Sequence, residues 1–213
     1  MSGRTGTRGR IDKRQAILDA AFVVFARRGY AQACVQEIAQ EAGVSKPTIY
    51  NHLGDKESLF REAMAAVGES VLAENLAIVE RIQDGPLDTV LEPVAVDLIR
   101  ACCGERSRAL RRLVNAEITQ FPDLLHHVQG HSSHQLGEAL AGRLARLALL
   151  GRLRPADPAA AAEQFLALLT APMEARSQLG TREVPDAEIA AVAAAAVDTF
   201  LRAYAADLEH SAA

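Results

Sequence analysis

Apolar residues recur at spacings of three and four along almost the whole chain, and this is the periodicity of α-helices. The first clear example is a stripe formed by Ile17, Leu18, Ala21, Phe22 and Phe25. No segment alternates convincingly between apolar and polar positions, as a half-buried strand would. The sequence therefore predicts an all-α protein in which three short helices are followed by longer ones.

Glycine, proline and N-cap residues predict where these helices begin and end. Gly29 is expected to close the first helix in a left-handed conformation, with Tyr30 folding back on the helix. The Asp-Pro pair at 157–158 predicts a helix start, because proline is tolerated at the first helical position. Pro93 and Pro172 lie inside helical patterns and are expected to kink or interrupt those helices.

Residues 35–53 have the spacing of a helix-turn-helix. Ile38 and Ala39 are expected to pack inward from the first helix of this motif. Gly43 then permits the sharp turn that leads into the second helix. With the helix that precedes it, the motif predicts a three-helix helix-turn-helix head.

The second helix of the motif has its own start signals. Ser45 is a suitable N-cap, and Pro47 falls in the first turn, where its missing N–H costs little. Val44, Ile49 and Leu53 are expected to anchor the helix inward. The remaining side chains combine a cation, hydroxyls, an amide and an imidazole, a set suited to base edges and phosphates in a DNA major groove. These exposed residues are Lys46, Thr48, Tyr50, Asn51 and His52.

Charge is distributed unevenly along the 213 residues, whose formal net charge is −4. Residues 1–56 contain nine basic and five acidic side chains, a net of +4, and residues 57–213 contain fourteen basic and twenty-two acidic ones, a net of −8. All three lysines of the chain lie in the first part. This asymmetry predicts a basic, anion-facing head on an acidic body.

Other classes of protein are not supported. No apolar segment follows the basic first ten residues, so no secretory signal is expected. The longest apolar run, Ile189–Val197, is shorter than the roughly 20 residues that cross a bilayer, so no membrane segment is expected. Three cysteines without a paired framework are typical of a reducing cytoplasm. No phosphate-binding loop, nucleophile motif or paired carboxylates point to an enzyme or to a cofactor.

The first part of the sequence resembles a known family, the TetR/AcrR transcriptional regulators of bacteria. The resemblance is dense over residues 13–60. It is carried by Ile17-Leu18-Asp19-Ala20-Ala21, Phe25, Gly29-Tyr30, Ile38-Ala39 and the continuous run from Ala42 to Phe60. A looser similarity to the carboxy-terminal domain of AcrR-like members is carried by Asn115-Ala116-Glu117, Phe121-Pro122-Asp123-Leu124, Gly151-Arg152-Leu153 and Asp157-Pro158.

The resemblance implies which residues touch DNA. Base-edge or phosphate contacts would come from the recognition helix, and Lys56 matches a position that holds a phosphate near a helix N-terminus. The implied DNA-binding set is Ser45, Lys46, Pro47, Thr48, Tyr50, Asn51, His52 and Lys56. Ala33-Cys34 stands where the family usually has Thr-Thr, which removes a hydroxyl cap, so no contact is assigned to Cys34.

The resemblance also implies the domain organisation: a flexible basic arm over 1–12, a helix-turn-helix domain over 13–60, and an effector-binding and dimerisation domain over 61–213. In the family the last two helices pair with their counterparts in a four-helix bundle. A dimer also suits DNA reading, because one recognition helix contacts too few bases for specificity. The expected function is a ligand-responsive repressor, a cytoplasmic homodimer on a palindromic operator.

Four of the six histidines are bunched at His126, His127, His131 and His134. Helical spacing places the last three on one face, and imidazoles at that spacing suit zinc. The intervening glycine and serines instead favour a helix break and a polar surface between helices, so no metal is predicted.

The same histidines, with polar residues before them, could line an effector pocket. The candidate effector contacts are Asn115, Glu117, Thr119, His127 and His131. Two alternatives stay open: a metal-responsive sensor that uses the His126–His134 cluster, and an effector-free helix-turn-helix protein of the nucleoid type.

Overall fold

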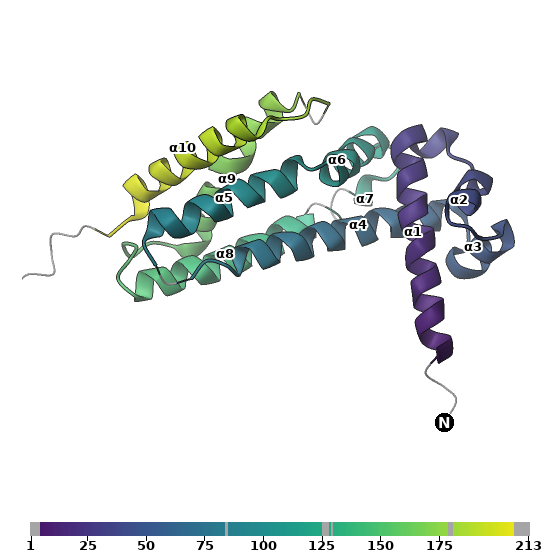
Figure 1. Cartoon of the computed structure of the whole chain (residues 1–213), viewed down its shortest axis with the longest axis horizontal. Helices are drawn as coiled ribbons and strands as arrows, with labels where there is room; N and C mark the ends of the chain where they lie inside the picture. Colours follow the sequence, from purple (N-terminus) through teal and green to yellow (C-terminus); the bar gives the residue numbers. More distant parts are fainter. Residues whose placement is uncertain (1–4, 84, 125–127, 129, 179–180, 207–213) are drawn as a thin grey trace, which may run out of the picture. The chain divides into compact units, whose positions relative to one another are not determined.

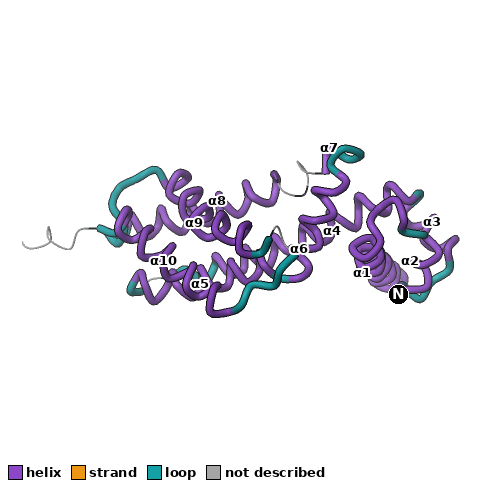
Figure 2. Tube along the Cα trace, turned by 90° about the horizontal axis from the view of Figure 1, so that it is seen from above, coloured by secondary structure: helices purple, strands orange, loops and turns teal. Residues whose placement is uncertain are grey.

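The computed structural model describes residues 5–83, 85–124, 128, 130–178 and 181–206, and only the backbone of residues 5–12. These residues are helical throughout, apart from turns and connections (Figure 2). Their one β feature is an isolated bridge between Leu153 and Ala205. The all-α prediction is confirmed.

The helices are numbered in chain order (Figure 1). Their bounds are α1 Thr5–Gln32, α2 Val35–Glu41, α3 Lys46–Leu53, α4 Lys56–Val79, α5 Leu87–Cys103, α6 Glu105–Glu117, α7 Pro122–Leu124, α8 His131–Leu149, α9 Pro158–Arg176 and α10 Asp186–Tyr204. None of these helices is both long and apolar enough to span a bilayer.

The chain forms two compact units. The N-terminal unit comprises residues 1–70 and 109–130, and the C-terminal unit comprises residues 71–108 and 131–213. The N-terminal unit therefore contains α1 to α3, and it also takes the first part of α4, most of α6 and α7. Two helices, α4 and α6, each contribute residues to both units.

Helix α1 changes direction at Gly29, whose φ of 74° lies in the region that favours glycine. Beyond this break the Tyr30 ring stacks on Phe25 with the centroids 6.1 Å apart, so the predicted fold-back is confirmed. At its other end α1 begins at Thr5, and its backbone therefore includes residues 5–12, most of the segment expected to be an arm.

An aromatic cluster forms the core of the N-terminal unit. Phe25, Phe60 and Phe121 are fully buried, and Tyr30 is half-buried among them. The ring centroids of Phe60 lie 4.9 Å from those of Phe25 and Tyr30, and 5.2 Å from that of Phe121. Aromatic pairs at these separations contribute about 0.5–1.5 kcal/mol each beyond area burial. The cluster joins residues from α1, α4 and the segment between α6 and α7.

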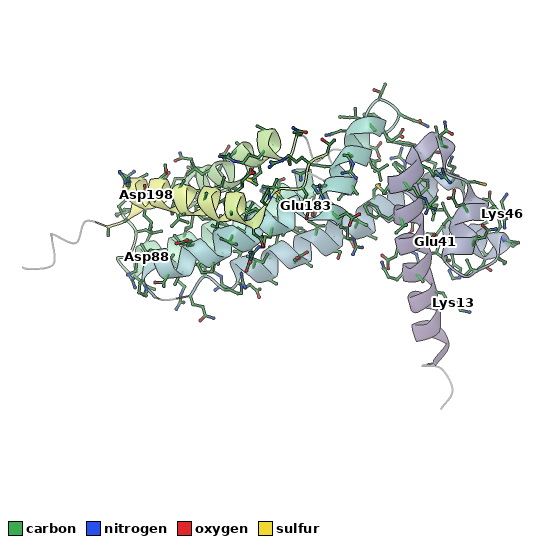
Figure 3. All side chains as sticks on the ribbon, turned by 45° about the horizontal axis from the view of Figure 1, so that its top comes forward. Lys13, Glu41, Lys46, Asp88, Glu183 and Asp198 are labelled. Carbon is green, nitrogen blue, oxygen red and sulfur yellow. The ribbon has the colours of Figure 1, made fainter. Side chains whose placement is uncertain are left out.

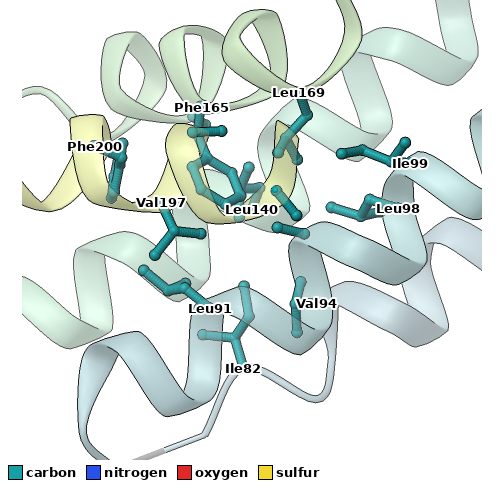
Figure 4. Close-up of a cluster of buried hydrophobic side chains, with 14 of the residues drawn as sticks. Ile82, Leu91, Val94, Leu98, Ile99, Leu140, Phe165, Leu169, Val197 and Phe200 are labelled. Carbon is teal, nitrogen blue, oxygen red and sulfur yellow. The ribbon is translucent and has the colours of Figure 1, made fainter. Parts of the chain in front are cut away.

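The core of the C-terminal unit is built from α5, α8, α9 and α10 (Figure 4). Phe165 of α9 and Phe200 of α10 pack edge to face with their centroids 4.9 Å apart. Leu91 of α5 and Leu140 of α8 are equally inaccessible to solvent. Each of these helices buries one apolar stripe, as the helical periodicity predicts.

One helix start and two prolines inside helices bear on the predicted helix boundaries. Asp157 is the N-cap of α9, since its carboxylate accepts a hydrogen bond from the Ala159 N–H at 2.9 Å. Helices α5 and α9 run on through Pro93 and Pro172, so of the two expected effects, a kink or an interruption, the interruption is wrong. Buried residues on both sides of each proline hold the helix in place, and this packing outweighs the lost backbone hydrogen bond.

Replacing Phe165 by alanine is expected to destabilise the C-terminal unit by about 3–5 kcal/mol, because it opens a cavity in a fully buried site. Urea unfolding monitored by circular dichroism measures this change. The control is Leu149→Ala, since Leu149 is 89% exposed and its removal should cost less than about 0.5 kcal/mol. Equal effects of the two substitutions would contradict the assigned core.

Candidate DNA-binding interface

Helices α2 and α3 are joined by a tight turn. The N–H of Ala42 donates to the Ile38 carbonyl and the N–H of Val44 to the Ala39 carbonyl, both at 2.9 Å. Gly43 between them has a φ of 64°, a conformation that other residues adopt only at a cost. The turn predicted at this glycine is confirmed.

The start of α3 is fixed by hydroxyls. Ser45 is its N-cap, and its Oγ accepts a hydrogen bond from the Thr48 N–H at 3.4 Å. The hydroxyls of Ser45 and Thr48 also lie 2.7 Å apart, within hydrogen-bonding distance. Pro47 occupies the first turn, where no intrahelical N–H is required. The predicted cap and proline position are both confirmed.

Burial divides α3 into two faces. Ile49 and Leu53 are 1% and 3% exposed, so they anchor the helix inward as predicted. The opposite face is polar, and Tyr50 on it is 41% exposed. Ser45, Lys46, Pro47 and Asn51 are also exposed, while Thr48 and His52 are half-buried. The structure thus brings the predicted recognition residues together on one short helix.

Lys46 and Tyr50 are one helical turn apart and interact. The Lys46 ammonium lies 5.7 Å from the centroid of the Tyr50 ring, within the range of a cation–π contact. Figure 3 shows the Lys46 side chain at the outer surface of α3. The contact holds a positive charge beside an exposed aromatic face, a pairing that can serve a phosphate and a base edge.

Lys56, at the first position of α4, has partners within the protein. Its Nζ donates to the Ala31 carbonyl at 3.2 Å and lies 4.7 Å from the centroid of the Tyr30 ring. An ammonium has three N–H donors, so this bond leaves donors for a phosphate. Lys56 therefore supports the connection between α1 and α2, and it keeps the capacity for the predicted DNA contact.

Helix α2 is tied to α1 by ion pairs. Glu37 accepts hydrogen bonds from Arg27 at 2.7 Å and from Arg28 at 3.4 Å. Desolvation alone would raise the pKa of the Glu37 carboxyl, but the two arginines together lower this pKa below its ordinary value. Cys34 is the N-cap residue of α2 and makes no side-chain cap bond, in agreement with the expected loss of a hydroxyl cap.

The predicted effector residues differ in their exposure to solvent. Asn115, Thr119 and His131 are exposed, and only Glu117 among the described members is half-buried. The Glu117 carboxylate accepts a hydrogen bond from the Tyr30 N–H at 3.1 Å. The remaining member, His127, lies outside the described residues.

The histidine cluster is described only in part, because His126 and His127 lie outside the described residues. Within the described ranges no group of three or more His, Cys, Asp and Glu side chains could hold a metal ion. His131 lies with a ring nitrogen 2.8 Å from the Gln135 amide nitrogen, and His134 pairs with Glu138 at 3.5 Å. These contacts are those of a polar helix surface.

Sequence reasoning missed how the segment after α6 supports the head. Phe121 packs on Tyr30 with the centroids 4.8 Å apart, and Asp123 forms an ion pair with Arg61 of α4. Desolvation alone would lower the pKa of the Arg61 guanidinium, but hydrogen bonds to Glu57 and Asp123 raise this pKa above its ordinary value. The available signal was a large aromatic residue placed directly before a helix-starting proline.

Comparison with known proteins decides the family. Residues 17–63 match the family described as bacterial regulatory proteins, tetR family. Residues 89–206 match the AefR-like transcriptional repressor, C-terminal domain, which covers more than half of the chain. The chain belongs to the TetR family. TetR-family proteins are helix-turn-helix transcriptional regulators rather than enzymes, and this is the coarse function of the protein.

Individual proteins resemble the chain over most of its length. The HTH-type transcriptional repressor AcnR of Corynebacterium efficiens is 33% identical over 162 residues, which cover 74% of this chain and 77% of AcnR. The fatty acid metabolism regulator protein of Bacillus subtilis is 31% identical over 158 residues, covering 66% of this chain and 79% of that protein. A TetR-family regulator of Mesorhizobium loti superposes with a TM-score of 0.82 at 28% identity, covering 92% and 98% of the two chains.

The Asp55 carboxylate, which lies between α3 and α4, makes the stability of the protein depend on pH. It accepts a hydrogen bond from the Ser58 N–H at 2.7 Å, and the hydrogen bonds from Ser58 lower the pKa of this carboxyl below its ordinary value. A depressed pKa contributes stability above the unfolded-state value, and this stability is lost as the pH falls through the folded-state value.

We therefore expect the stability difference between the wild type and Asp55→Asn to be constant above about pH 5 and to shrink as the pH falls below about 4. Asparagine keeps an oxygen acceptor but has no titrating carboxyl. Urea unfolding at pH 3 to 7 measures the difference. A difference that grows towards low pH would contradict the assigned hydrogen bond from Ser58 to the Asp55 carboxylate.

Proposed function

We propose that this TetR-family protein is a ligand-responsive transcriptional repressor that binds a palindromic DNA operator as a homodimer. The observation that carries the proposal is the division of α3, with Ile49 and Leu53 buried and a continuous polar face outside. A short helix held in this way can enter a major groove without rearranging its own core. The relative AcnR is named a transcriptional repressor, which supports repression rather than activation.

The proposed DNA contacts come from the surface of α3 and from the first residue of α4. Lys46 and Lys56 would contact phosphates, while Thr48, Tyr50, Asn51 and His52 would contact phosphates or base edges. Ser45 and Pro47 shape the start of the helix that presents these side chains.

The charge distribution supports this assignment. Residues 1–56 carry the net +4, whereas the remainder carries −8. Figure 3 labels Lys13, Glu41 and Lys46 on the N-terminal unit and Asp88, Glu183 and Asp198 on the C-terminal unit. An acidic C-terminal unit would lower the affinity for arbitrary DNA, so that the α3 contacts carry the discrimination.

The C-terminal unit offers a surface for a second copy. A groove of about 430 Å³ runs between α9 and α10, and nearly all of its lining surface is apolar. Ala167, Ala171 and Ala203 line this groove and are exposed to solvent, although their side chains are apolar. Small side chains allow helices to approach closely, which suits a four-helix interface between two copies. A two-fold dimer would supply the two recognition helices that a palindrome needs.

The functional division proposed here keeps DNA binding in residues 13–60, and effector binding and dimerisation in residues 61–213. An effector would act by binding one arrangement of the dimer more tightly than the other. Asn115, Glu117, Thr119, His127 and His131 stay predictions for effector contacts. None of the described contacts favours the metal-sensor or the effector-free alternative.

The DNA-binding proposal is tested with Lys46→Ala and Tyr50→Ala. DNA fragments that the wild type selects from the genome of its source serve as the operator, and fluorescence anisotropy measures binding. We expect each substitution to weaken operator binding by about 10-fold or more, and Lys46→Ala to reduce the salt dependence by about one phosphate contact.

The control variant is Arg202→Ala, which removes an exposed cation from α10 and should change operator affinity less than about twofold. Selection of no specific fragment by the wild type would contradict the proposal. So would unchanged binding by both α3 variants.

The dimer proposal is tested with Ala203→Glu, which places a carboxylate in the apolar groove of each copy. Burying an unpaired charge is costly, so the dimer dissociation constant should rise by about 100-fold or more. Sedimentation equilibrium measures this constant. Ala77→Glu, on the exposed side of α4, is the control and should leave it unchanged. A monomeric wild type, or an unaffected Ala203→Glu dimer, would contradict the proposal.

A further inference from the structure

The connection between α1 and α2 is held by side chains from outside the helix-turn-helix. Because α1 breaks at Gly29, the residues that follow begin a new turn, in which the Ala33 N–H donates to the Gly29 carbonyl at 3.3 Å. The first N–H groups of such a turn have no partner within it. We call residues 29–34, which lead directly into α2, the α1–α2 corner.

Glu117 provides the missing partner at the start of the corner. Its Oε1 accepts a hydrogen bond from the Tyr30 N–H at 3.1 Å, across 87 residues of sequence. This is the role of an N-cap side chain, played here by a residue from the last position of α6. A charged acceptor on a partly buried N–H makes a stronger bond than a neutral one.

Lys56 holds the other side of the corner. Its Nζ donates to the Ala31 carbonyl at 3.2 Å, so consecutive residues of the corner are bonded by a carboxylate and by an ammonium. The Tyr30 ring between them packs on Phe60 and Phe121 at 4.9 and 4.8 Å. Burial, followed by the neighbouring carboxylates of Glu57, Asp55 and Glu117, raises the pKa of the Tyr30 hydroxyl, which therefore stays neutral.

The corner sets the start of the DNA-reading helices. Helix α2 begins at Val35, directly after the corner, and α2 packs on both α1 and α3. A displacement of the Tyr30 peptide would therefore move the start of α2 and, through it, the polar face of α3. The Glu37 ion pairs hold the middle of α2 but do not reach the corner.

We propose that Glu117 is a positioning residue for DNA recognition: by capping the Tyr30 N–H it fixes the α1–α2 corner and thereby the orientation of α3. This inference rests on the proposed function for its DNA-binding consequence. It gives Glu117 a role that requires no contact with DNA or with an effector. Glu117 and Tyr30 both belong to the N-terminal unit, so the bond lies within one unit.

The test compares Glu117→Ala, which removes the acceptor, with Glu117→Gln, which keeps an oxygen at the same distance from the backbone. Glu69→Ala is the matched control, because Glu69 is an exposed glutamate of α4 in the same unit. Three quantities are measured on the full-length protein: hydrogen exchange of the Tyr30 amide, affinity for a genome-selected operator, and affinity for a DNA of random sequence.

We expect Glu117→Ala to speed Tyr30 amide exchange by about 10-fold or more and to weaken operator binding by a similar factor, since one charge-assisted hydrogen bond is lost. Random-sequence binding should change less than about twofold, because it depends on the cations alone. Glu117→Gln should restore most of the operator affinity, and Glu69→Ala should match the wild type. A general loss of folding would instead weaken both kinds of binding.

The inference is overturned if Glu117→Ala leaves Tyr30 amide exchange unchanged, or if it weakens operator and random-sequence binding equally. It is also overturned if Glu117→Gln does not restore the operator affinity. A wild type that selects no operator would contradict the proposed function instead. In that case the exchange measurement still decides whether Glu117 caps the corner.

Discussion

The aromatic cluster is the constraint on which the N-terminal unit depends. Phe60 contacts Phe25 and Tyr30 of α1 and also Phe121, so one ring on α4 joins two segments that are far apart in sequence. Tyr30 fits this cluster only because α1 breaks at Gly29 and the chain folds back. The polar contacts from Glu117 and Lys56 then secure the peptide groups beside the ring. The aromatic packing thus provides the frame on which α2 and α3 are mounted.

The recognition helix meets a second requirement, since a DNA-reading surface must be exposed and yet well ordered. Helix α3 is only eight residues long and would not be stable alone. Its N-terminus is capped by Ser45, and Ile49 and Leu53 fix it inward. Its outward side chains are therefore free to be polar without weakening the fold. Family membership and the local geometry point to the same surface.

The sequence predicted local features well, because these depend on neighbouring residues. The Ser45 cap, the turn at Gly43 and the burial of Ile49 and Leu53 follow from spacing and residue type within one motif. The bond from Tyr30 to Glu117 spans 87 residues and depends on tertiary packing, so no local pattern could reveal it.

The predicted effector residues show the opposite limit of sequence reasoning. Asn115 and Thr119 are polar residues near apolar ones, and such a pattern does not distinguish a side chain in a pocket from one in water. Both are exposed in the structure. Pro93 is expected to kink or interrupt a helix, and the packing of α5 carries the helix past it without an interruption. In each case the deciding factor is the burial of neighbouring residues, which sequence spacing alone does not specify.

The central claim is that two copies of the α3 polar face read DNA together. Genome-wide mapping of the DNA fragments that the purified protein binds tests it most directly. We expect fragments that share an inverted repeat, with half-sites about 10 base pairs apart or a multiple of that spacing. We expect a Lys46→Ala, Tyr50→Ala double variant not to enrich them. Bound fragments that share no inverted repeat, or that the double variant enriches equally, would contradict it.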